Sequence, residues 1–234
     1  MAGYLTPTQN THNISGRQGC SPWNSEKRMS KRILSISFLL TLAAMVAAMM
    51  TMPVQAAGDA EKGAVLATAC LGCHGIPGYR NAYPSYRVPK LGGQHQEYIA
   101  IGLKGYKGEN RAHLTMQAQA TDLSEQNIAD LSAWFSAQGE LSSGSAKNNA
   151  RIGRGKEKSA TCTACHGETG ISPMPNWPIL AGQHEDYLKQ ALHQYKLGSR
   201  KDPVMAGQVI NLSEEDIDDL AAYFAAQPGL TSIN

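Results

Sequence analysis

Aromatic side chains are scarce in this sequence. Only three of its 234 residues are Phe, and aromatic residues make up 6% of the chain. The hydrophobic share of 42% fits a globular chain of one or two domains and excludes disorder as the main state. So few large side chains would fill two domain cores thinly, and we expect something else to occupy part of them.

The sequence also lacks a strong net charge, and its number of cysteines is odd. The formal charge is +2 and the pI is near 8.2, too close to balance for a nucleic-acid-binding protein, which usually carries a clustered basic face. The five cysteines cannot all form disulfides within one chain. No stretch alternates polar and apolar residues convincingly, so the pattern predicts an all-α fold.

Residues 1–56 have the pattern of an export signal. Basic residues precede an apolar run over 33–50, and small residues follow it, as in a secretory signal peptide. We expect cleavage after Ala56 or Ala57 and a native start at Met29, because the residues before Met29 lack apolar periodicity. An uncleaved membrane anchor is the alternative, since about 18 apolar residues span a bilayer.

Cleavage after Ala56 would change the charge and the cysteine count. It leaves 16 basic against 18 acidic residues, a formal charge of −2, so the basic pI belongs to the export signal. It also removes Cys20 and leaves four cysteines. The mature protein is then expected in the periplasm, where free thiols are prone to oxidation.

The mature chain is a tandem duplication. Residues 91–138 align without a gap on residues 180–227, and 21 of the 48 positions are identical. Such self-similarity marks a repeated structural unit. We predict a first domain over 57–140, a linker over 141–149 and a second domain over 150–234. Each domain is so small that its core is marginal without a staple, a metal or a cofactor.

Helical spacing of apolar residues recurs in both copies. In each copy one helix ends in a cysteine motif, a second carries aromatic residues, and a final helix is opened by a serine N-cap. The expected helices lie over 59–74 and 150–166, over 94–106 and 183–195, and after Ser124 and Ser213. The buried stripes expected on the final helices are Ile128, Leu131, Trp134 and Phe135, and Ile217, Leu220, Tyr223 and Phe224.

Each copy contains the motif C-x-x-C-H, which is the attachment signal of c-type haem. On a helix, the i, i+3 spacing places both sulfurs on one face, where each can add to a haem vinyl group. The histidine that follows can bind the iron. We therefore predict two covalently bound c-type haems, held by Cys70, Cys73 and His74, and by Cys162, Cys165 and His166.

The same cysteines could serve other chemistry. A thioredoxin-like dithiol needs a strand before the motif within an α/β fold, whereas here a helix precedes it. A zinc site built from two cysteine pairs leaves His74 and His166 without a role. Structural disulfides are a third alternative. Two copies of the motif, at equivalent places in an exported chain, favour haem.

A low-spin haem that carries electrons usually needs a sixth ligand, and a Met thioether raises its potential relative to a second His. Met116 and Met205 occupy equivalent positions, and we expect them on loops just before the final helices, as axial ligands. Core packing is the alternative for both. His95 and His184 are also duplicated and are the rival ligands, although exposed imidazoles at a helix start are the simpler expectation.

Two further duplicated pairs could support the haems. Pro89 and Pro178 align, and a carbonyl at each position could accept a hydrogen bond from Nδ1 of the iron-binding histidine, which would fix the ring. Arg111 and Arg200 lie five residues before each Met and could pair with haem propionates. The alternative for both arginines is an exposed charge.

These motifs together resemble the dihaem cytochrome c4 family, and the resemblance covers 57–227. It is carried by the two C-x-x-C-H motifs, the Met segments and the final helices, and it is best in the second copy, at 178–183 and 212–217. The first copy departs modestly without losing a ligand, and has a longer Tyr-rich segment. The resemblance implies two cytochrome c folds packed against each other, with haem propionates near their interface.

The resemblance also implies a periplasmic electron shuttle of a respiratory chain, between a cytochrome bc complex and a terminal oxidase. Outer-sphere electron transfer agrees with it, because iron with both axial positions filled has no open site for substrate. The alternatives are the haem subunit of a flavocytochrome or other dehydrogenase, and a haem enzyme or gas sensor lacking one Met ligand. We expect redox proteins as partners, no nucleic acid, and a monomer or weak dimer; peripheral membrane association is left open.

Overall fold

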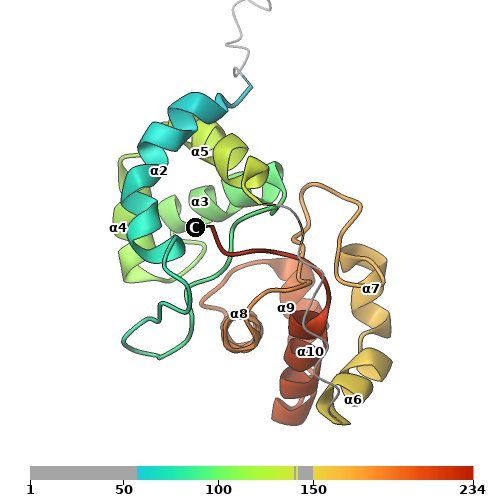
Figure 1. Cartoon of the computed structure of the whole chain (residues 1–234). Coiled ribbons are helices and arrows are strands. Elements are labelled where there is room, and N and C mark those ends of the chain that lie inside the picture. Colours follow the sequence, from blue (N-terminus) through green and yellow to red (C-terminus); the bar gives the residue numbers. More distant parts are fainter. Residues whose placement is uncertain (1–56, 140, 142–149, 234) are drawn as a thin grey trace, which may run out of the picture. The chain divides into compact units, whose positions relative to one another are not determined.

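The computed structural model describes residues 57–139, 141 and 150–233 (Figure 1). The expected signal peptide and nearly all of the expected linker lie outside these residues. The first half of the described chain holds α2 (Ala60–His74), α3 (Gln96–Lys107), α4 (Leu114–Thr121) and α5 (Glu125–Ala137). The second half holds α6 (Ala150–Lys158), α7 (Ala160–His166), α8 (Glu185–Lys196), α9 (Pro203–Val209) and α10 (Glu214–Ala226).

The all-α prediction is confirmed. Within the described ranges, β structure is confined to isolated bridges between single residues. None of the helices in those ranges is long and apolar enough to cross a membrane. The serine caps are confirmed as well, since Ser124 and Ser213 open α5 and α10, each with a reciprocal capping box.

Two details of the helix prediction are wrong. The helix expected over 150–166 is broken at Ser159, whose hydroxyl donates to the Lys156 carbonyl and so competes with the helix ladder. The loops expected around the two methionines are short helices, and Met116 and Met205 are the third residues of α4 and α9. A side chain caps each of these helices, which gives short segments a defined start.

The cores of the two halves are built on equivalent helix pairs, α2 with α5 and α6 with α10. Glycine permits both crossings: a Cβ at Gly63 would overlap the Asp130 carbonyl, and a Cβ at Gly155 would overlap the Asp219 carbonyl. The expected buried stripes are confirmed, except that Trp134 is only half-buried.

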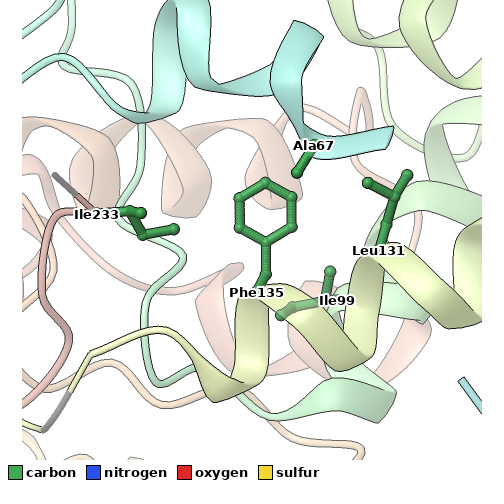
Figure 2. Packing of buried hydrophobic residues seen from close by; sticks show 5 residues of the cluster. All are labelled: Ala67, Ile99, Leu131, Phe135 and Ile233. Atoms are coloured by element: carbon green, nitrogen blue, oxygen red, sulfur yellow. The ribbon is translucent and has the colours of Figure 1, made fainter. Parts of the chain in front are cut away.

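The C-terminal segment leaves the second half and completes the core of the first. Figure 2 shows the Phe135 ring pointing from α5 toward Ala67 on α2, with Ile233 packed beside them. The backbone N–H of Thr231 donates to the Gly92 carbonyl at 3.2 Å, which anchors this segment. The described residues between 57 and 233 accordingly form one compact unit.

Candidate haem sites

The two motif histidines end α2 and α7 and have equivalent surroundings. Nδ1 of His74 lies 3.0 Å from the Pro89 carbonyl, and Nδ1 of His166 lies 3.0 Å from the Pro178 carbonyl. Burial lowers the pKa of both imidazoles, so each ring is neutral and Nδ1 carries the donated proton. Nε2 of each ring then carries a free lone pair, and it is the atom that can bind iron.

The four motif cysteines are half-buried on the helices that end in those histidines. Before haem is attached, burial raises the pKa of the Cys70 and Cys162 thiols. Cys70 packs against the core cluster of the first half and Cys162 against that of the second. The thiols therefore face apolar surroundings of the kind that a porphyrin would share.

The two methionines sit in equivalent, locally anchored positions. The backbone N–H of Met116 donates to the His113 ring at 3.2 Å, and that of Met205 donates to the Asp202 carboxylate at 3.0 Å. Both side chains are half-buried. His113 is half-buried and caps α4.

The rival histidines are not the exposed imidazoles that we expected. His95 and His184 are both half-buried. Nε2 of His95 contacts the Ser172 carbonyl at 2.9 Å, across the interface between the halves. Burial, together with the charges of Arg87 and Lys90, lowers the pKa of His184 to about 4. The contact with Ser172 thus occupies the His95 ring within the interface.

The two arginines meet at the interface between the halves, paired through an isolated antiparallel bridge. Arg200 is only 4% exposed, which excludes the alternative of an exposed charge at that position. Both guanidinium groups donate to the hydroxyl of Tyr98, and Arg200 also lies over the Tyr195 ring at 4.7 Å. In the described part of the chain, neither arginine forms an ion pair with a carboxylate.

The side chains present fit a covalently attached haem. Nε of Arg200 is buried without a hydrogen-bond partner in the described residues, so the interface holds a positive charge that its own residues leave partly unsatisfied. A haem brings two carboxylates, two vinyl groups and an iron. Each half offers matching groups: a buried arginine or its equivalent, two thiols on one helix face, and a neutral imidazole.

A family model described as cytochrome c matches the chain twice, over residues 60–138 and 152–227. The chain belongs to the cytochrome c family. Cytochrome c4 of Pseudomonas aeruginosa is 32% identical to it over 203 residues, which cover 81% of this chain and 96% of that one. The solved structure of Acidithiobacillus ferrooxidans cytochrome c4 has a TM-score of 0.60 at 31% identity, over 68% of this chain and 99% of that one.

A third relative carries a different functional name. The thiosulfate dehydrogenase electron acceptor of Stutzerimonas stutzeri is 30% identical over 203 residues, which cover 79% of this chain and 93% of that protein. Taken with the cytochromes c4, these relatives confirm the resemblance: this is a dihaem cytochrome c of the c4 type, with two covalently bound haem c groups, and it acts as an electron carrier.

Sequence reasoning missed the tyrosines that surround the arginine pair. Tyr98, Tyr106, Tyr187 and Tyr195 all contribute to the electrostatics of Arg200. Their signal was present in the alignment, because Tyr98 matches Tyr187 and Tyr106 matches Tyr195. The duplication shows that these tyrosines occupy equivalent positions in both copies, but it does not predict that all four lie at one interface.

Proposed function

We propose that this cytochrome is a periplasmic electron shuttle of a respiratory chain, which takes electrons from a cytochrome bc complex or a similar donor and delivers them to a terminal oxidase. The observation that carries the proposal is that the histidine at the end of each motif is neutral and held through Nδ1 by a backbone carbonyl. A ligand held in this way stays in place in both oxidation states, which keeps reorganisation small.

In this proposal His74 and Met116 would bind the iron of the first haem, and His166 and Met205 would bind that of the second. Bound haem supplies a one-electron couple at the iron. The Pro89 and Pro178 carbonyls orient the imidazoles and increase their basicity. Arg111 and Arg200 compensate haem propionates at the interface. With both axial positions occupied by protein, electrons would pass without any substrate binding to iron.

The ligand assignment is tested by optical and magnetic spectroscopy of the oxidised protein. We expect a Met-to-iron charge-transfer band from each haem. Met116→Ala should remove one of the two contributions, about half of the band, and Met205→Ala should remove the other, because each variant deletes one thioether. Two bis-histidine spectra in the unaltered protein would contradict the assignment, and ready carbon monoxide binding at either reduced haem would favour the sensor alternative.

A second candidate function is the electron-accepting subunit of a periplasmic dehydrogenase, including a flavocytochrome. The relative from Stutzerimonas stutzeri named as an electron acceptor of thiosulfate dehydrogenase favours this alternative. Copurification from native cells distinguishes the two functions, since a subunit is recovered as a stable heteromer with its dehydrogenase. A shuttle is recovered alone. Its haems are reduced rapidly by a membrane quinol-oxidising complex and not by a dehydrogenase.

A further inference from the structure

Two buried glutamines make reciprocal contacts across the interface. Gln94, in the first half, is 4% exposed, and its side chain bonds to both backbone groups of Ile179 in the second half, at 2.9 and 3.0 Å. Gln183, at the aligned position of the second half, is 5% exposed and bonds to both backbone groups of Lys90 in the first half, also at 2.9 and 3.0 Å.

The residues that these glutamines bind follow the two prolines directly. The N–H of Lys90 and the carbonyl of Pro89 belong to one peptide group, whose carbonyl accepts from His74 while its N–H donates to Gln183. The peptide group between Pro178 and Ile179 joins His166 to Gln94 in the same way. Each motif histidine is thus linked, through one peptide group, to a glutamine of the opposite half.

We propose that Gln94 and Gln183 are positioning residues, each of which tunes the haem of the opposite half through the peptide group that holds its histidine. The inference rests on the proposed ligation by His74 and His166. A peptide N–H that donates a hydrogen bond polarises its own carbonyl, which then accepts more strongly. The stronger contact gives the imidazole more anionic character, and such a ligand stabilises ferric iron.

The direction of the effect follows from this polarisation. Gln183→Met keeps the side-chain volume but removes the acceptor for the Lys90 N–H. We expect the first haem, on His74, to become easier to reduce by about threefold in its equilibrium constant, about 28 mV at 59 mV per tenfold for one electron. Gln94→Met should do the same to the second haem, on His166. Each variant should leave the haem of its own half unchanged.

The measurement is a spectroelectrochemical redox titration of the whole protein, followed by NMR of the axial methionine methyl groups. Met116→Ala and Met205→Ala assign the two redox waves and the two methyl signals. Shifts of both haems together, of the haem in the same half, or of neither haem would overturn the inference. Gln183→Glu retains an acceptor oxygen, so the first haem should be no easier to reduce than in the unaltered protein; easier reduction would count against the inference.

A matched control separates this link from general loosening of the interface. His95→Leu removes another hydrogen bond between the halves, from the ring to the Ser172 carbonyl, and touches neither peptide group. It should leave both potentials unchanged, and shifts equal to those of the glutamine variants would overturn the inference. The spectrum of the unaltered protein tests the ligand assignment separately: if it shows His and Met ligation while the glutamine variants change nothing, the link alone has failed.

Discussion

At the scale of single residues, the interface places two guanidinium groups together. Buried charges are normally paired, because transfer of an uncompensated charge from water is costly. Arg111 and Arg200 instead share the hydroxyl of Tyr98, a neutral partner. The proximity of both arginines lowers the pKa of Tyr98, against the effect of its own burial. A site with this much unbalanced positive charge attracts anionic groups.

Replacing one of these arginines should therefore alter the redox chemistry. We expect Arg200→Gln to make at least one haem harder to reduce, by about tenfold in the equilibrium constant, because a positive charge nearby favours the reduced form. A redox titration measures the change. Arg151→Gln removes an equal charge from a half-exposed pair with Glu185 and should have much less effect. Equal shifts in both variants would show that overall charge alone is responsible.

His184 should make stability depend on pH. Its pKa is lowered to about 4 in the folded protein, whereas an unfolded histidine titrates near 6.5. Between these values the unfolded chain binds more protons, so stability should rise with pH across this window and be lost as pH falls toward 4. His184→Gln should flatten this part of the profile, as measured by denaturant unfolding at several pH values. An unchanged slope would contradict the assignment.

At the scale of elements, prediction succeeded where local contacts decide the structure. Ser124 and Ser213 bond to backbone groups three residues away, so the signal for α5 and α10 lies within a single turn. The short helices α4 and α9 were missed because seven or eight residues carry little periodicity. The start of α9 was nevertheless readable, since Asp202 followed by Pro203 is a cap followed by a favoured first residue.

The close crossing of α6 and α10 gives a test at this scale. We expect Gly155→Ala to lower the free energy of unfolding by about 1–3 kcal/mol, because the new methyl group would overlap the Asp219 carbonyl. Gly153→Ala is the matched control on the same helix, where nothing lies within 4 Å of the added Cβ. The control should be neutral or stabilising by up to about 1 kcal/mol. Thermal unfolding of both variants measures the difference. Equal stability of the two variants would contradict close packing of α6 against α10 at Gly155.

At the scale of the whole molecule, the sequence did not predict which residues make contact between the two halves. The alignment paired Gln94 with Gln183 and Arg111 with Arg200, which marked them as shared by both copies. It did not indicate that each glutamine would contact the opposite copy, because a repeat describes each unit and not the packing between units. The link from His74 to Gln183 therefore needed three-dimensional contacts to be seen.

The C-terminal segment gives a prediction that involves both halves. Ile233 is 7% exposed and packs in the core of the first half. Ile233→Ala should lower the free energy of unfolding by about 2 kcal/mol, through lost burial and a partly filled cavity. Thr231→Ser, in the same segment, keeps the backbone contact with Gly92 and serves as the control. If Ile233→Ala unfolds at the same denaturant concentration as the control, the packing shown in Figure 2 contributes no stability.

The position of Ile233 near the end of the chain also determines when the core of the first half can be completed during synthesis. A ribosome adds about 5–20 residues each second, so this side chain is made roughly 5–20 s after Phe135, its partner in the same cluster. Until then the core of the first half lacks one of its buried side chains, although helices α2 to α5 have already been synthesised. The first half therefore completes its core only when the last residues of the chain have been made, although its own helices come first in the sequence.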